Sequence, residues 1–137
     1  MQRLDDQQVV RALRPDGSVV AEQVRVAKSF RSRLVGLLGT RELPDGHGLL
    51  IEPGGGIHTF FMKYAIDVVF LNHSGMILEA TSAMAPNRLK FAPRACAAVV
   101  EFGAGWIARH GVVNGETLQF AESTDRQRVD NGGRNEC

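Results

Sequence analysis

The feature that most constrains the fold is residues 65–71, a run rich in Ile, Val and Phe that is interrupted by Asp67. β-branched and aromatic residues of this kind predict a strand, in which alternate side chains point to opposite faces. One face carries Asp67 with Val69 and Leu71, and the other carries only apolar residues. Both faces are therefore apolar, and the carboxylate of Asp67 is expected in or near the core.

Asp67 needs a partner at such a position, because burying an unpaired carboxylate is very costly. One interpretation is that it fixes a loop through backbone amides, and the other is that it is a functional acid. We expect it to pair with a cation, either an arginine of residues 30–41 or Lys63. The side chains considered as partners are His58, Lys63, Arg33 and Arg41.

Most of the remaining chain also predicts short strands, separated by Gly, Pro, Asn and Asp turns. They are expected at residues 19–26, 48–52, 76–80, 95–102 and 117–120, with an extended segment at 58–62. Residues 4–14 form a weak strand or short helix that makes an N-terminal hairpin with 19–26. Residues 83–93 contain two prolines and predict an irregular crossing segment, and 103–110 allows one helical turn.

Residues 30–38 have a helical period instead. Apolar residues recur there at spacings of three and four, namely Phe30, Leu34, Leu37 and Leu38. Ser29 is a candidate N-cap, and Gly39 can end the helix. We therefore expect an α+β fold, mostly an antiparallel and barrel-like β domain, with one clear helix and one or two short helical turns. Residues 1–120 form the single domain, and 121–137 form a polar mobile tail.

Composition narrows the class of protein. The chain has 137 residues, 44% of them hydrophobic and 23% charged, which fits one globular domain. Its net charge of +1 gives no reason to expect nucleic acid or a membrane as partner. We identify no signal peptide at the N-terminus, and the two cysteines make no disulfide framework, so a cytoplasmic location is expected.

Few residues suggest chemistry directly. His58 follows three glycines and is a candidate base or ligand, but no second histidine lies at metal-ligand spacing, so no metal or cofactor is expected. Cys96 lies among alanines and fits an inert thiol better than a nucleophile. Glu101 lies between Val100 and Phe102, and a semi-buried carboxylate there could form an acid/base couple with Asp67.

Several motifs in order resemble the uncharacterised family called domain of unknown function 192. They are residues 33–41, Leu43, 48–51, 58–62, 66–71, 100–102 and Gly105, within a similarity that covers about residues 19–120. The resemblance implies a compact, barrel-like β domain with short helices and brings no established activity. Its motif residues correspond here to Arg33, Gly36, Arg41, His58, Met62 and Asp67. The chain departs from the pattern at Leu38 and Glu116, where the family often has Met and Asp.

The preferred functional hypothesis is a small, non-enzymatic binding or accessory domain for a small molecule or a protein. Its groove would lie near the His-Thr-Phe-Phe-Met and Ile-Asp segments. The candidate ligand-binding residues are Arg33, Arg41, His58, Met62, Lys63, Asp67 and Glu101. One alternative is a hydrolase-like enzyme that uses Asp67 with Glu101 or His58, and another is a structural module that docks onto a partner protein.

Overall fold

A computed structural model describes residues 8–28, 43–52, 56–60 and 62–122 of the chain. The predicted helix at 30–38 lies outside these residues, as do Arg33 and Arg41. Within them, no helix is long and apolar enough to cross a membrane.

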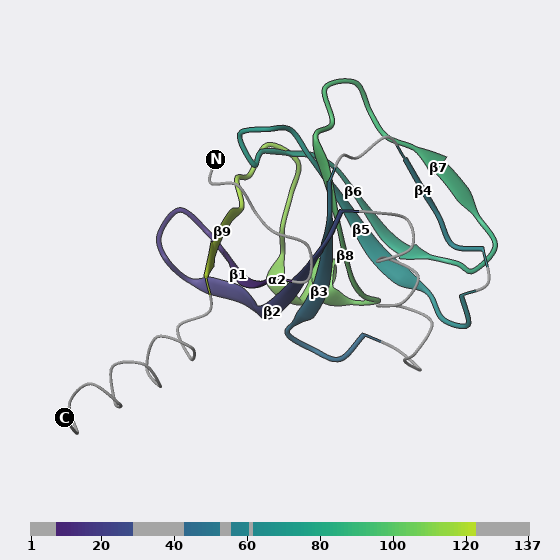
Figure 1. Cartoon of the computed structure of the whole chain (residues 1–137), viewed down its shortest axis with the longest axis horizontal. Coiled ribbons are helices and arrows are strands. Elements are labelled where there is room, and N and C mark those ends of the chain that lie inside the picture. Colours follow the sequence, from purple (N-terminus) through teal and green to yellow (C-terminus); the bar gives the residue numbers. More distant parts are fainter. Residues whose placement is uncertain (1–7, 29–42, 53–55, 61, 123–137) are drawn as a thin grey trace.

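The fold consists of a large mixed sheet, a small second sheet and one short helix among the described residues (Figure 1). The seven-stranded sheet has the order β6-β5-β8-β3-β2-β1-β9, and β4 and β7 form a two-stranded sheet. Neighbouring strands are antiparallel except for the parallel pair β2–β3. The elements are β1 (Val9–Leu13), β2 (Val19–Ala27), β3 (His47–Ile51), β4 (Gly56–His58), β5 (Ile66–Leu71), β6 (Ile77–Met84), β7 (Leu89–Phe91), β8 (Ala98–Gly103), α2 (Trp106–His110) and β9 (Gln119–Glu122).

Most predicted strands are confirmed, and so is the hairpin of β1 with β2. The helical turn expected within residues 103–110 is α2. Three predictions about segments need correction. Of the extended segment expected at 58–62, only His58 lies in a strand, because β4 covers Gly56–His58. Residues 83–93 are not irregular throughout, because they contain β7. Strand β9 covers Gln119–Glu122, so it ends two residues beyond the strand expected at 117–120.

The expectation of a barrel is wrong, because the large sheet does not close. Its edges are β6 and β9, which do not pair as strands. They approach only through a single bridge between Met76 and Thr117 and a few hydrogen bonds around it. Beyond that point β9 follows β1 instead, pairing from Gln119 with Leu13 to Glu122 with Val10. The strand β9 therefore forms its backbone hydrogen bonds with β1, and β6 remains an edge strand of the sheet.

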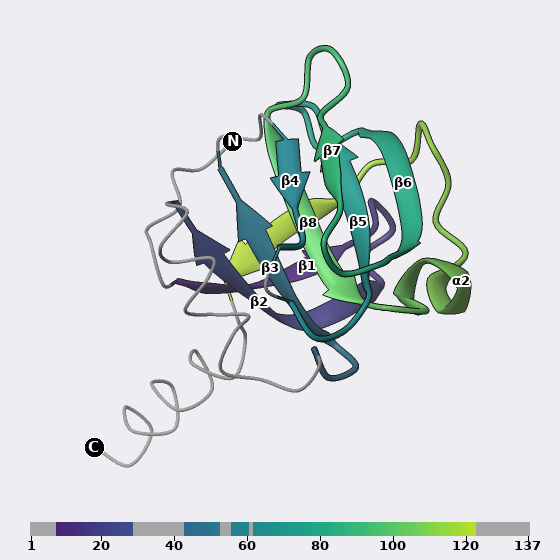
Figure 2. The ribbon, with the colours of Figure 1, turned by 90° about the vertical axis from the view of Figure 1, so that its right-hand side faces the viewer.

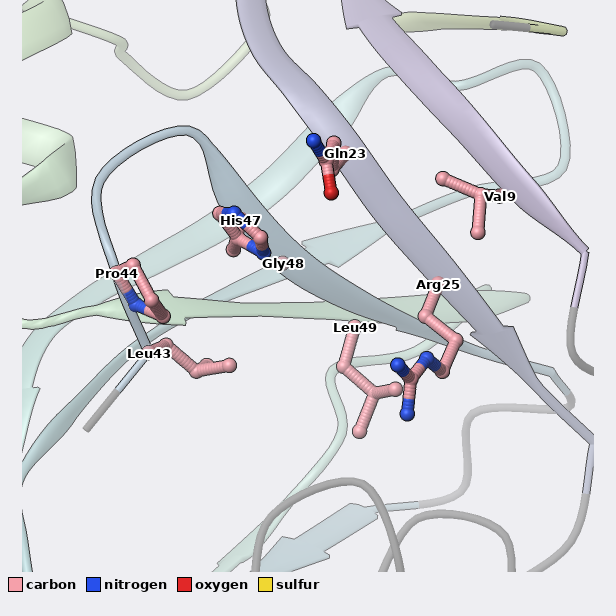
Figure 3. Close-up of a pocket in the computed structure, with 8 residues that line it drawn as sticks. All are labelled: Val9, Gln23, Arg25, Leu43, Pro44, His47, Gly48 and Leu49. Atoms are coloured by element: carbon pink, nitrogen blue, oxygen red, sulfur yellow. The ribbon is translucent and has the colours of Figure 1, made fainter. Parts of the chain in front are cut away.

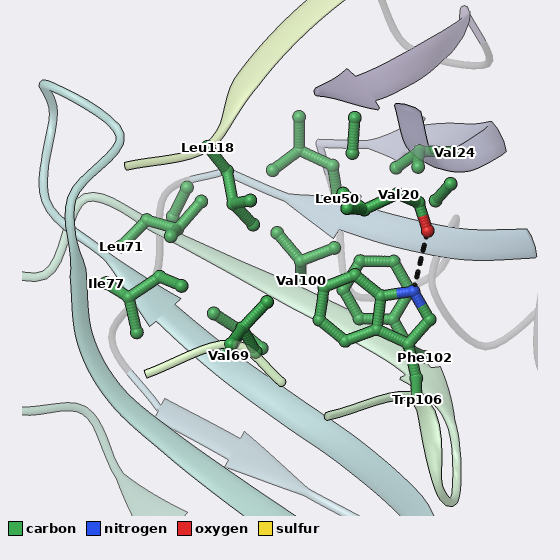
Figure 4. Close-up of a cluster of buried hydrophobic side chains, with 14 of the residues drawn as sticks. Val20, Val24, Leu50, Val69, Leu71, Ile77, Val100, Phe102, Trp106 and Leu118 are labelled. Atoms are coloured by element: carbon green, nitrogen blue, oxygen red, sulfur yellow. Dashed lines mark hydrogen bonds between the residues drawn. The ribbon is translucent and has the colours of Figure 1, made fainter. Parts of the chain in front are cut away.

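Two hydrophobic clusters occupy the two faces of the large sheet. The first includes Val100, Phe102 and Trp106, whose indole N–H donates to the carbonyl of Val20 at 2.9 Å (Figure 4). The second lies between the opposite face and the small sheet, with Ile57 of β4 among its members. Figure 2 shows β4 and β7 in front of β5 and β8, as this layering requires. Alternate residues of β5 and β8 therefore enter different cores.

Candidate functional site

Asp67 lies in β5 on the side of the first cluster, because its cross-strand partner is Phe102. It is fully buried, as the sequence predicts. One carboxylate oxygen accepts a hydrogen bond from the backbone N–H of Ala83 at 2.8 Å. The other accepts from the N–H of Ile107, also at 2.8 Å. Ile107 is the second residue of α2, whose N-cap residue Gly105 has no side chain to offer. Asp67 thus takes the role of the capping carboxylate.

The expectation that Asp67 pairs with a cation is not met among the described residues. Lys63, one of the predicted partners, is exposed and forms no ion pair with it there, and Arg33 and Arg41 lie outside those residues. Among the described residues, two backbone amides donate charge-assisted hydrogen bonds to the carboxylate. This arrangement corresponds to the other interpretation, in which Asp67 fixes neighbouring segments through amides.

Glu101 is the second fully buried carboxylate, and it lies on the other face of the sheet. Its cross-strand partners are Leu49 of β3 and Val68 of β5, both members of the second cluster. Since Asp67 pairs with Phe102 in the first cluster, the sheet itself separates the two carboxylates. A substrate on one side of the sheet would therefore meet only one carboxylate of the proposed acid/base couple of Asp67 and Glu101.

A hollow of about 290 Å³ opens on the Glu101 face of the sheet, over β2 and β3 (Figure 3). The residues that line it are Val9, Gln23, Arg25, Leu43, Pro44, His47, Gly48 and Leu49. The register pairs Gln23 with His47 and Arg25 with Leu49, so these side chains share one face. A guanidinium, an imidazole and an amide thus lie together, and the other described residues that line the hollow are apolar or glycine.

A second hollow, of about 390 Å³, lies on the other side of Leu43 and Pro44, which line both. Asp45 and Arg109 also line it and form an ion pair at 3.1 Å. Position 103 of β8, which also lines this hollow, requires glycine, because a Cβ there would meet the carbonyl oxygen of Leu43 at 2.5 Å. The backbone of Leu43 therefore lies directly against β8 at Gly103, at the border of this second hollow.

Of the predicted site residues that the structure describes, none is among the described residues that line either hollow. Met62 is buried in the second cluster, on the opposite side of the sheet from Asp67. His58 is half-buried and stacks on Phe60, with ring centroids 5.0 Å apart. The predicted groove would need Met62 and Asp67 on one side of the sheet, and the strand register places them on two sides.

Two further groups have environments that alter their acidity. Partial burial raises the pKa of the Cys96 thiol, which donates to the carbonyl of Ala98 at 3.3 Å. Partial burial also lowers the pKa of His110, and the positive charge of Arg109 adds to the effect. The described residues contain no cluster of three or more His, Cys, Asp or Glu side chains suited to hold a metal ion.

Sequence reasoning missed Gln23, Arg25 and His47 as candidate site residues. Gln23 and Arg25 do carry a signal, because they alternate with the buried Val24 and Val26 on a predicted strand. Their position opposite His47 depends on the parallel pairing of β2 with β3, which no local pattern specifies.

Comparisons with known proteins agree on the family and the fold. The family described as DUF192, uncharacterized ACR, matches residues 11–120. No curated protein matches the chain. A crystal structure of a proposed transcription regulator from Sinorhizobium meliloti 1021 is similar, with a TM-score of 0.70 and 23% identity over 87% of this chain and 98% of that one. So is a protein of unknown function from Novosphingobium aromaticivorans DSM 12444, with a TM-score of 0.68 and 19% identity over 81% and 83% of the two chains.

Proposed function

Since this chain belongs to the uncharacterised DUF192 family, we propose from its own residues that it is a small, non-enzymatic binding domain. The ligand site is the hollow over β2 and β3, and the ligand class is a small organic anion with a short apolar part. The observation that carries the proposal is the placement of Arg25 and His47, with Gln23 beside them, in a hollow whose other described lining residues are apolar or glycine.

The chemistry of the hollow supports this ligand class. Ligand sites are mostly apolar and contain a few polar groups that fix the orientation of the ligand. A guanidinium forms paired hydrogen bonds with a carboxylate, so Arg25 is the natural contact for the anionic end. Leu43, Pro44 and Leu49 offer apolar surface for the remainder. A volume of about 290 Å³ lies at the lower end of the range of small-molecule sites, so it has room for a small ligand.

The geometry favours binding over hydrolysis. Two carboxylates that act together as acid and base must reach one substrate from the same side of the sheet. Asp67 faces the first cluster and Glu101 faces the second. Both oxygens of Asp67 are already occupied by amides of the protein. This argues against the form of the enzyme alternative that pairs Asp67 with Glu101.

The test is a titration of the full chain with butyrate, butanol and butylammonium, followed by amide chemical shifts. Butyrate alone should shift the amides of residues 23–25 and 47–49. Arg25→Gln should weaken butyrate binding by about tenfold or more, because a hydrogen bond to a charged group contributes about 1.5–3 kcal/mol. Arg94→Gln, which removes an exposed arginine outside the hollow, is the matched control. Equal shifts from butanol, or an unaltered affinity in Arg25→Gln, would contradict the proposal.

A further inference from the structure

The outer face of the small sheet carries large apolar side chains. Ile57 of β4 points inward to the second cluster, so its neighbours Gly56 and His58 point outward. The register pairs His58 with Leu89 and Gly56 with Phe91, which places Leu89 and Phe91 on the same outer face. Figure 2 shows this sheet at the surface, with the large sheet behind it.

These side chains are unusually exposed for their size. Phe91 is 78% exposed, Leu89 is 58% exposed and Phe60 is 40% exposed. Gly56 stands opposite Phe91 and offers no side chain to cover it. Phe60 stacks on His58 and so adjoins the same face. Grouped exposed apolar side chains of this kind mark interaction surfaces. We call the group of His58, Phe60, Leu89 and Phe91 the aromatic patch.

The segments that form the aromatic patch carry only positive charge. Residues 53–66 and 80–100 contain no Asp or Glu, although the chain has 15 acidic residues. They contribute the exposed cations Lys63, Arg88 and Arg94. Lys90 forms an ion pair with Glu79 of β6 at 3.0 Å. Both segments that bear the apolar side chains therefore also carry exposed basic residues close to them in the sequence.

The aromatic patch is also held in place before any partner arrives. The buried hydroxyl of Thr59 donates to the carbonyl of Ala85 at 2.6 Å and accepts from the N–H of Arg88 at 2.8 Å. Backbone hydrogen bonds join Thr59 to Arg88 and Asn87 as well. These bonds fix the segment that bears Phe60 against the segment that leads into β7. A preformed surface loses little conformational entropy on binding.

From this combination we infer that the aromatic patch docks a short acidic segment of a partner protein that also carries apolar side chains. Leucine and phenylalanine side chains of the partner pack on Phe91 and Leu89, and its carboxylates face Lys63, Arg88 and Arg94. A nucleic acid is a poorer match, because binding a polyanion requires many cations and the whole chain has a net charge of only +1. Leu89, which pairs with His58 across the small sheet, also offers no flat surface for base stacking.

The experiment measures fluorescence anisotropy of a labelled ten-residue peptide of alternating Glu and Leu/Phe on the full chain. Controls are the same peptide with Lys in place of Glu, a ten-nucleotide oligothymidine, and vesicles that contain phosphatidylserine. We expect binding of the acidic peptide alone, weakened at high salt, with amide shifts at residues 56–60 and 88–94. Phe91→Ser and Arg88→Glu should each weaken it by about tenfold or more.

Two variants serve as matched controls. Val113→Ser removes another exposed apolar side chain, 63% exposed and outside the aromatic patch, and Arg25→Gln removes an arginine of the hollow. Both should keep the wild-type affinity for the peptide. The inference fails if the acidic peptide does not bind, if oligothymidine or vesicles bind in its place, or if Phe91→Ser binds as well as Val113→Ser. The ligand proposal for the hollow is unaffected by any of these results, because Arg25→Gln reports on it separately.

Discussion

Asp67 faces Ala83 across a β-bulge, and its carboxylate accepts the N–H of Ala83 at 2.8 Å. One residue of β5 stands there against two residues of β6, because the register shifts between Ile66–Met84 and Val68–Thr81. Ala83 has a φ of 50°, in the left-handed region that alanine rarely adopts. The second carboxylate oxygen of Asp67 accepts a hydrogen bond from the N–H of Ile107. Asp67 therefore joins the bulge of β6 to the first turn of α2.

Replacing Asp67 should destabilise the protein strongly. Asp67→Ala removes both charge-assisted hydrogen bonds, each of which contributes about 1.5–3 kcal/mol, so we expect a loss of about 3–5 kcal/mol in the free energy of unfolding. Asp67→Asn keeps one acceptor oxygen but turns an NH₂ group toward the second amide, and should lose about half as much. Denaturant unfolding measures both. Glu22→Gln, at an exposed position of β2, is the control and should stay within about 0.5 kcal/mol. Wild-type stability in both Asp67 variants would show that the carboxylate is not an anchor.

Thr59→Val tests the bonds that fix the aromatic patch. Valine has the same shape but neither donates to Ala85 nor accepts from Arg88. Leaving these backbone groups without their partner should lower the free energy of unfolding by about 1–3 kcal/mol. Amide exchange at Arg88 should become faster at the same time. Thr81→Val makes the same change in β6 and is the reference; equal effects in the two variants would contradict the role of Thr59.

Ala95→Gly should stabilise the protein. The N–H of Cys96 donates to the carbonyl of Pro93 at 3.2 Å, which closes a turn with Ala95 as its third residue. Ala95 has a φ of 70°, the value that a type II turn requires and that glycine adopts without strain. We expect a gain of about 0.5–1 kcal/mol in the free energy of unfolding. Ala121→Gly, in the exposed part of β9, should have the opposite sign. A loss in Ala95→Gly would mean that the strain is relieved elsewhere.

Local patterns predict the strands well and their arrangement less well. Residues 65–71 carry β-branched and aromatic side chains on both faces, and β5 is indeed buried on both sides. β7 was missed because two prolines flank it and two of its three residues, Leu89 and Phe91, are exposed, so it has no pattern of burial. The open sheet was missed because closure depends on whether β9 pairs with β6 or β1, a choice between distant segments.

For the candidate site too, local sequence patterns predict burial but not the contacts between distant residues. Burial of Asp67 follows from its neighbours alone, and the structure confirms it. Its hydrogen bonds to Ala83 and Ile107 join residues 16 and 40 positions away, and no spacing rule predicts such contacts. Likewise, only the register of β5 with β8 shows that Asp67 and Glu101 face opposite sides of the large sheet.

His110 should make the protein less stable in mild acid. Partial burial, aided by the charges of Arg109 and Arg14 and opposed by Asp45, lowers its pKa below the ordinary value of 6.5. As the pH falls through that value, the unfolded chain takes up the proton before the folded protein does. The contribution of neutral His110 to the free energy of unfolding is therefore fully present above about pH 6.5. It is lost as the pH falls toward the lower pKa of His110 in the folded protein.

The measurement is the difference in free energy of unfolding between wild type and His110→Gln, from denaturant melts between about pH 8 and pH 5. Carboxylates and other histidines contribute equally to both proteins, so their effects cancel in the difference. The advantage of the wild type should shrink as the pH falls, because only the wild type carries the titrating imidazole at this position. His73→Gln makes the same replacement in an exposed turn and provides the reference. A wild-type advantage that grows in acid would mean that the folded protein binds the proton of His110 more tightly than the unfolded chain. The tilted ring contact of His110 with Trp106 would then favour the imidazolium.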